Sequence, residues 1–512
     1  MTPIEHLLEV YRMSEPSVFA GLPGLVLAIF AIITLLADLF ELGTSRGAAE
    51  DGEGPAIMAP WLAMIGIVLA FGAVVWQALR LETEAGVYFN GMIALDGYAT
   101  FLSGVVLAAT LLTLLLTVGY SRRHNVDLSE YYHLILMAAV GMILMVEAAN
   151  LVLVFLGLEL MSVAVYILTG FRRTQIRSIE AALKYFVLGA FSTGFLVYGI
   201  ALIYGTTGSM GLAEIGGRIA AGPPSALLLA GVGLLIVGFG FKVALVPFHM
   251  WSPDVYEGAP TPITGFMATG VKAAGFAAFL RVFASSFDAL ASQWVPVLWV
   301  LAVLTMLVGN VAAIRQDDVK RMLAYSSIAH AGYLAVAIVA HNALGATAVL
   351  YYLAAYTAMT LGAFGVAVTL SRRGDERTSI SRDYAGLGYR EPMLAAAMAI
   401  FMFSLTGIPP TAGFVGKFTI ISAAVDAGHV PLAVLLVVAS VISAYYYLKV
   451  VVSMYMTAPE GSPAPARIGS LAGIALFVAV LAVLGLGIFP GEWIEMARAS
   501  VEGMATTVAG LP

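Results

Sequence analysis

Lysines placed in apolar runs are the residues of this 512-residue chain whose type and spacing most suggest chemistry. The chain has six lysines, and five of them lie within long apolar segments: Lys184, Lys242, Lys272, Lys417 and Lys449. Each charged lysine at the centre of a membrane helix costs about 2.5–3.5 kcal/mol on insertion scales. Burial disfavours the ammonium form, so a lysine at that depth can exchange its proton near neutral pH, whereas arginine stays charged. The pattern therefore predicts a row of proton-transfer groups.

Two of these lysines also have a simpler interpretation. Lys449 lies near the end of its apolar run, and a long side chain there can extend to the membrane surface. The same applies less strongly to Lys184, which lies a little deeper. Lys242, Lys272 and Lys417 lie far from the ends of their runs, so for them we favour proton transfer.

Glu159 is the acidic residue that lies deepest in an apolar run, within NLVLVFLGLELMSVAVY. Lys184 lies in the next predicted helix, so a helix hairpin could bring the two side chains together and couple their titrations. The alternative is a static buried ion pair that only fixes packing. His249 and His330 are possible relays along the same path, or hydrogen-bonded histidines of the core.

Prolines break two of the helices that must position these lysines. Lys242 is followed by Pro247 and Pro253, and Lys417 is preceded by GIPP, residues 407–410. Proline removes a backbone hydrogen bond, and the freed carbonyl at membrane depth must meet protein or water. Broken helices that carry a charge in corresponding positions are typical of a transporter site at the membrane midplane.

The lysine spacing also predicts an internal repeat. Lys417 follows Lys242 by 175 residues, and Lys449 follows Lys272 by 177. That offset equals five predicted helices, and because five is odd the second copy would be inverted in the membrane. We therefore expect a three-helix segment at 1–125, repeats at 126–290 (helices 4–8) and 291–457 (helices 9–13), and a last helix with a tail at 458–512.

Composition sets the fold class, because 61% of the residues are apolar and only 11% are charged. Soluble domains are about 45–50% apolar and about 25% charged, so the chain is predicted to be an all-α polytopic membrane protein. The absence of cysteine excludes disulfides and thiolate-bound metal clusters, and a net charge of −6 gives no support for nucleic-acid binding.

Fourteen membrane spans are predicted, near 17–39, 58–79, 98–118, 132–147, 150–169, 179–205, 225–248, 262–284, 294–313, 322–340, 344–370, 392–425 (one broken helix), 431–457 and 469–489.

The loops predict the orientation, since basic residues concentrate on the cytoplasmic side of membrane proteins. With both termini outside the cytoplasm, 15 basic residues fall in cytoplasmic loops and 5 in the opposite ones. The first group is Arg46, Arg122, Arg123, Arg172, Arg173, Arg177, Arg315, Lys320, Arg321, Arg372, Arg373, Arg377, Arg382, Arg390 and Arg467, and the second is Arg12, Arg80, Arg218, Arg281 and Arg498.

Three segments resemble the antiporter-like subunits of respiratory complex I. They are FKVALVPFHMWSPDVYEGAPTPITGFMATGVKAAGFAAFLR (241–281), DDVKRMLAYSSIAHAGY (317–333) and GIPPTAGFVGKF (407–418). With LGLEL at 156–160, the similarity spans most of 130–455. The chain is most similar to the bacterial N-type members. It has lysine at 417, where the M-type subunit is expected to have glutamate, and it does not resemble the L-type subunit, which has a long lateral helix.

The resemblance implies a membrane-arm subunit of NADH:quinone oxidoreductase, a translocase, that moves protons while electrons travel elsewhere. It implies that Glu159 and Lys184 form a coupling pair, that Lys242 is the central lysine, and that Lys272 and Lys417 are the relay and the terminal station. His249 and His330 match family histidines on the same polar axis. It further implies that this chain binds no cofactor or metal, and that NADH, FMN, iron–sulfur clusters and quinone belong to partner subunits.

The implied partners are an M-type antiporter-like subunit, small K-, J-, A- and H-type subunits, the hydrophilic arm and membrane lipids, but no nucleic acid. The implied location is the bacterial inner membrane. Two other functions remain open from the sequence: a subunit of a cation/proton (Na⁺/H⁺) antiporter, which shares the lysine motif, and a membrane scaffold without transport. The cost of inserting several lysines argues against the scaffold.

Overall fold

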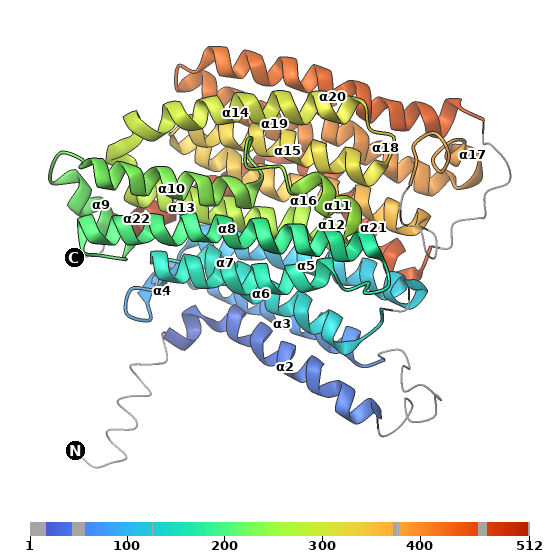
Figure 1. Cartoon of the computed structure of the whole chain (residues 1–512), viewed down its shortest axis with the longest axis horizontal. Coiled ribbons are helices and arrows are strands. Elements are labelled where there is room, and N and C mark those ends of the chain that lie inside the picture. The colour runs from blue at the N-terminus through green and yellow to red at the C-terminus, as the bar shows by residue number, and fades with distance from the viewer. Residues whose placement is uncertain are drawn as a thin grey trace.

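The computed structural model describes residues 17–42, 57–124, 126–371, 376, 378–458 and 468–509. Most of its helices run side by side along the long axis of the molecule (Figure 1). The elements are α2 (Leu22–Leu42), α3 (Ala59–Ala78), α4 (Leu81–Glu84), β1 (Gly86–Tyr88), β2 (Ile93–Leu95), α5 (Gly97–His124), α6 (Ser129–Glu147), α7 (Leu151–Thr169), α8 (Ile176–Thr207), α9 (Leu212–Ala220), α10 (Ala226–Val243), α11 (Ser252–Gly258), α12 (Thr261–Phe266), η2 (Met267–Val271), α13 (Lys272–Ser286), η3 (Asp288–Leu290), α14 (Ala291–Ile314), α15 (Val319–Val339), α16 (Ala343–Leu370), α17 (Leu387–Arg390), α18 (Pro392–Thr406), α19 (Ala412–Asp426), α20 (Val430–Met456), α21 (Ser470–Ile488) and α22 (Pro490–Ala509).

The described part of the chain contains 12 helices that are long and apolar enough to cross a membrane. Two shorter apolar helices, Leu22–Ala37 and Pro392–Thr406, complete a set that matches the fourteen predicted spans in order. Within the described residues the strands form one short antiparallel hairpin, β1 and β2, between α4 and α5. The prediction of an all-α polytopic membrane protein is confirmed.

Local sequence signals explain where several helices begin. Asn150, Ser225, Asp318 and Asn342 precede α7, α10, α15 and α16, and each side chain accepts a hydrogen bond from a backbone N–H of the first turn. These caps satisfy donors that have no partner within the helix. They matter for the site because all four helices carry predicted site residues or their partners: Glu159 in α7, Lys242 in α10, His330 in α15 and its partner Tyr352 in α16.

The two predicted helix breaks are present and have similar ends. Ala244 directly follows α10 and Gly407 directly follows α18, and both residues have a left-handed backbone with φ of 63° and 91°. Lys242 lies before the first break, in the last turn of α10, whereas Lys417 lies after the second, in α19. The breaks thus place lysines beside helix ends, as the prolines predicted.

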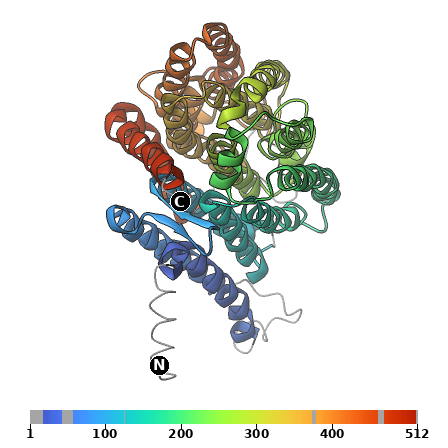
Figure 2. The ribbon, with the colours of Figure 1, turned by 90° about the vertical axis from the view of Figure 1, so that its left-hand side faces the viewer.

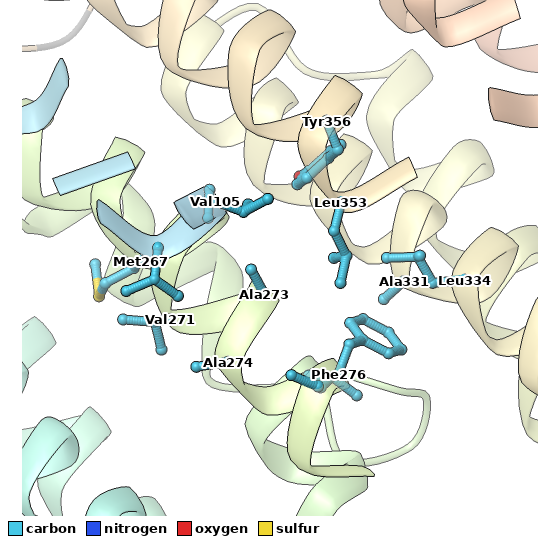
Figure 3. Packing of buried hydrophobic residues seen from close by; sticks show 14 of the residues in the cluster. Val105, Met267, Val271, Ala273, Ala274, Phe276, Ala331, Leu334, Leu353 and Tyr356 are labelled. Atoms are coloured by element: carbon cyan, nitrogen blue, oxygen red, sulfur yellow. The ribbon is translucent and has the colours of Figure 1, made fainter. Parts of the chain in front are cut away.

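The N-terminal helices lie at one edge of the bundle and α20 at the opposite edge (Figures 1 and 2). The centre is formed by α5, α12–α13, α15 and α16. Figure 3 shows Val105, Val271, Leu334 and Leu353 of these elements among the buried apolar side chains between them. Dense apolar packing on all sides is the setting in which the buried lysines must find polar partners.

Two basic residues counted as loop residues are instead buried in helices. Lys320 lies in the first turn of α15 with 0% of its surface exposed, and Arg281 lies in α13 with 1% exposed. Arg281 is stabilised there by two hydrogen bonds to the Asp96 carboxylate, at 2.8 and 2.9 Å. Their pairing partners are distant in sequence, which is why the sequence suggested loops. The predicted loop residues Arg12, Arg46, Arg372, Arg373, Arg377 and Arg467 lie outside the described residues.

Candidate functional site

The Lys242 ammonium is buried between α7, α8 and α10. Its Nζ donates to the Ser162 hydroxyl at 2.8 Å and lies 5.8 Å from the centre of the Tyr185 ring. Only 4% of the lysine surface is exposed. Ser162 in turn donates to the carbonyl of Leu158, one turn earlier in α7. The lysine is therefore held by one neutral hydroxyl and an aromatic face, rather than by a carboxylate.

A small cavity beside Lys242 brings Glu159 into the same site. The cavity of about 10 Å³ is lined by Lys242, Ser162 and Thr193, and this volume is close to the lower limit for one water molecule. The Thr193 hydroxyl donates to Glu159 at 2.7 Å. Hydroxyl groups both donate and accept, so Thr193 and Ser162 can connect the carboxylate with the lysine across this cavity.

Lys184 does not contact Glu159 among the described residues. Its Nζ bonds Glu180 at 2.7 Å and Asp254 at 2.8 Å, and its side chain is 41% exposed. Partial burial raises the pKa of Asp254, but hydrogen bonds from Lys184 and Arg321 outweigh burial and hold that pKa below its usual value. The expected direct pairing of Glu159 with Lys184 is therefore not seen in this conformation.

The surroundings of Lys184 are polar and open. Together with Arg177, Glu180, Asp254 and Glu257 it lines a groove of about 190 Å³ where α8 meets α11. Such mixed charges in an open groove are well solvated, so the ion pairs contribute little stability individually. Lys184 is therefore solvated and paired with carboxylates, whereas Lys242 is buried and bonds a neutral hydroxyl.

Lys272 is the first residue of α13, directly after the π-helical turn η2. Its Nζ donates to the carbonyl oxygen of Ser327 at 2.6 Å and also to the Ser327 hydroxyl. The residue is 2% exposed, so this serine of α15 supplies both polar contacts of a buried cation. π-Helical turns frequently occur at functional sites.

His330 lies one turn further along α15 and is fully buried among tyrosines. Its Nδ1 lies 2.6 Å from the Tyr352 hydroxyl, and its Nε2 lies 3.0 Å from the Tyr447 hydroxyl. Tyr447 also bonds the hydroxyl of Ser326. Each ring nitrogen thus has one hydroxyl partner, which suits a histidine that passes a proton from one side to the other.

Lys417 closes the end of the broken helix α18. Its Nζ donates to the carbonyl oxygens of Leu405 and Thr406, both at 2.9 Å, and lies 4.9 Å from the centre of the Tyr333 ring. The last carbonyls of a helix lack partners and carry the negative end of its dipole. A cation from α19 therefore satisfies the backbone of α18.

Helix α15 connects these groups. Ser327, His330 and Tyr333 recur at intervals of three residues and so lie along one side of the helix, spanning about 9 Å. Ser327 contacts Lys272, and Tyr333 contacts Lys417. The arrangement brings the predicted residues Lys272, His330 and Lys417 to one side of α15 within an apolar core.

Neither His249 nor Lys449 is hydrogen-bonded to Lys272, His330 or Lys417 in the described part of the chain. The His249 imidazole lies in the break after α10, and its Nδ1 has no hydrogen-bond partner among the described residues. Lys449 is partly exposed, with Nζ 3.2 Å from the Gln316 carbonyl oxygen and 3.8 Å from Asp317. Its position near a polar loop agrees with the simpler interpretation of a lysine that extends toward the membrane surface.

Sequence reasoning missed the side chains that contact the buried lysines. Ser162 lies three residues after Glu159, and Ser327 and Tyr333 each lie three residues from His330. Helical residues three apart share a face, so the polar residues at these spacings were the available signal. No group of three or more His, Asp or Glu residues in the described part of the chain has a metal-binding arrangement.

Comparisons with known proteins identify the family of this chain. Residues 148–443 match the family model described as "NADH:quinone oxidoreductase/Mrp antiporter, TM". The chain is 45% identical over 484 residues to NADH-quinone oxidoreductase subunit N of Trichlorobacter lovleyi, covering 94% of this chain and 96% of that protein. It is 49% identical over 490 residues to subunit N 1 of Sorangium cellulosum, covering 91% and 95%.

Chains of two solved complexes have the same fold as this chain. A chain of respiratory complex I from Thermus thermophilus with bound aureothin has a TM-score of 0.76 and 37% identity, covering 93% of this chain and all of that one. A chain of the Mrp complex from Dietzia sp. has a TM-score of 0.81 but only 19% identity, covering 96% and 100%, which shows the fold alone. The chain therefore belongs to the NADH:quinone oxidoreductase/Mrp antiporter family, and within it to the NADH-quinone oxidoreductase subunit N proteins.

Proposed function

We propose that this chain is a proton-translocating membrane-arm subunit of NADH:quinone oxidoreductase. The observation that carries the proposal is the path of buried lysines, hydroxyls and His330, in a chain that belongs to the subunit N proteins. Lysines buried against neutral partners can accept and release protons as neighbouring charges change.

The contacts support the following proposed roles. Lys242 exchanges protons with Glu159 through Ser162, Thr193 and the small cavity between them. Lys272 and His330 carry protons along α15, and Lys417 is the last station. Lys184 belongs to the open groove with Asp254, from which its charge acts on Glu159 when the two helices move relative to each other. His249 is a possible further relay at the break after α10.

The assembly and its location belong to the same proposal. We infer that NADH, FMN, iron–sulfur clusters and quinone are bound by partner subunits. The partners are an M-type antiporter-like subunit, small K-, J-, A- and H-type subunits, the hydrophilic arm and surrounding lipids. The distribution of basic residues favours the bacterial inner membrane with both termini on the periplasmic side. The division into two inverted five-helix repeats, 126–290 and 291–457, likewise stays a prediction.

A Lys242→Met variant of the assembled complex tests the function. We expect NADH-driven proton pumping into inverted membrane vesicles to fall more than about tenfold, because methionine cannot carry a proton. The amount of this chain relative to its partner subunits in the purified complex, measured by mass spectrometry, shows how much complex is assembled. Normal pumping by a normally assembled variant would contradict the proposal.

The second candidate is a subunit of a Na⁺/H⁺ antiporter, favoured by the fold shared with the Mrp chain. Vesicles that contain the chain without redox partners distinguish the two functions. Na⁺-driven proton exchange that needs no NADH would favour the antiporter, whereas pumping that depends on NADH oxidation favours the redox-driven pump.

A further inference from the structure

A loop carboxylate, Glu376, is buried where three parts of the chain meet. It lies between α16 and α17 and is only 8% exposed. It bonds the Tyr120 hydroxyl of α5 and the Arg172 guanidinium that follows α7. Its Oε2 accepts from both the backbone N–H and the hydroxyl of Thr261, at 2.9 and 2.6 Å. Thr261 is the first residue of α12, so the carboxylate closes the positive end of that helix.

The same carboxylate faces a second helix start. Lys320, in the first turn of α15, lies 3.4 Å from Oε2 and donates to the carbonyl oxygen of Ala259 at 2.7 Å. Two cations, the buried Lys320 and the partly buried Arg172, therefore face this one anion. Burial raises the pKa of Glu376, but the two cations outweigh burial and bring that pKa to about 2. At neutral pH the group is a fixed negative charge and does not carry protons.

The two helices held by Glu376 are those that meet at Lys272. Helix α12 leads through η2 directly to Lys272, and α15 carries Ser327 seven residues after Lys320. Seven residues are about two turns, so Lys320 and Ser327 lie on the same side of α15. One carboxylate thus fixes the starts of both helices whose side chains form the Lys272–Ser327 contact.

We propose that Glu376 is a positioning residue for proton transfer, holding α12 and α15 in the register that places the Lys272 ammonium on Ser327. The inference rests on the proposed pumping function and assigns a role in it to a residue outside the lysine path. The negative charge is essential, because without it Lys320 and Arg172 repel each other in a buried site.

A Glu376→Gln variant of the assembled complex tests the inference, with Glu495→Gln of the exposed part of α22 as the matched control. We expect proton pumping per assembled complex to fall about tenfold in Glu376→Gln, a size typical of losing charged hydrogen bonds, and to stay unchanged in the control. A structure of the variant complex should show Lys272 moved off Ser327. Normal pumping per assembled complex, or reduced pumping with the Lys272–Ser327 contact intact, would overturn the inference.

Two milder variants keep the test decisive if Glu376→Gln does not assemble. Thr261→Val and Tyr120→Phe each delete one hydroxyl that bonds Glu376, but only Thr261 begins the helix that leads to Lys272. We expect Thr261→Val to reduce pumping per complex more strongly than Tyr120→Phe. Equal effects of the two variants would contradict the inference.

If Lys242→Met itself pumps normally, the proposed function fails. If Lys242→Met is impaired while the Glu376 and Thr261 variants pump normally, only this inference fails.

Discussion

The two broken helices hold their lysines in opposite ways. Lys242 lies before the break and bonds the side-chain hydroxyl of Ser162. Lys417 lies after the break and bonds two backbone carbonyls at the end of the broken helix itself. Both ammonium groups also lie over tyrosine rings, at 5.8 Å for Tyr185 and 4.9 Å for Tyr333.

The difference separates proton transfer from structural support. Ser162 keeps its own hydrogen bond to Leu158, so no buried polar group loses its partner when Lys242 is replaced. The carbonyls of Leu405 and Thr406 end a helix within the membrane and depend on Lys417 as their donor. We therefore infer that Lys242 serves mainly in transfer, whereas Lys417 serves in transfer and in holding the break.

The largest expected effects on pumping and stability are those of Lys417→Met, and Lys242→Met is the variant with which it is compared. Both variants should lose more than about tenfold in pumping, because neither methionine can carry a proton. Only Lys417→Met should also lower stability, by about 1–3 kcal/mol for each carbonyl left without a donor. The difference in stability is measured by heating the purified complexes and recording the temperature at which this subunit is lost. Equal stability of the two variants would remove the distinction between the two breaks.

The next effect concerns the single hydroxyl that holds Lys242. Ser162→Ala should reduce pumping by about tenfold, because a hydrogen bond to a charged group is worth about 1.5–3 kcal/mol. Ser162→Thr keeps the hydroxyl and is the matched control. Pumping rates normalised to assembled complex give the comparison. If Ser162→Ala pumps as well as Ser162→Thr, the hydroxyl is not part of the transfer path.

A smaller effect is expected at the aromatic face beside Lys417. Tyr333→Leu removes the ring and should reduce pumping several-fold, since a cation–π contact contributes on the order of 1 kcal/mol. Tyr333→Phe keeps the ring and loses only the hydroxyl, which accepts from Asn310. Tyr333→Phe should therefore retain most of the pumping. A larger loss in Tyr333→Phe than in Tyr333→Leu would show that the hydroxyl, and not the ring, matters.

The sequence predicted the helices well because their signals are local. Apolar runs and the prolines around Lys242 and Lys417 gave the spans and both breaks. The sequence could not predict which side chains contact each buried charge, because these contacts depend on how distant helices pack. Lys320 and Arg281 show this most clearly, since each is buried against a carboxylate far away in sequence, Glu376 and Asp96. Lysines in apolar runs were identifiable by their insertion cost, whereas hydroxyl partners such as Ser162 carry no such signal.

The smallest effect should come from Lys449, which the sequence grouped with the other lysines of apolar runs. Its side chain is 36% exposed, and its nearest carboxylate, Asp317, lies 3.8 Å away with 48% exposure. Exposed ion pairs are worth about 0–1 kcal/mol. Lys449→Met should therefore change the pumping rate by less than about twofold and the stability by less than about 1 kcal/mol.

The same assays as for Lys417→Met apply, and the two variants are matched because both remove one lysine from the second half of the chain. A loss in Lys449→Met as large as in Lys417→Met would mean that enclosure does not decide which lysines carry protons. A small effect would instead show that burial against specific partners, rather than position within an apolar run, distinguishes transfer lysines from lysines that extend to the surface.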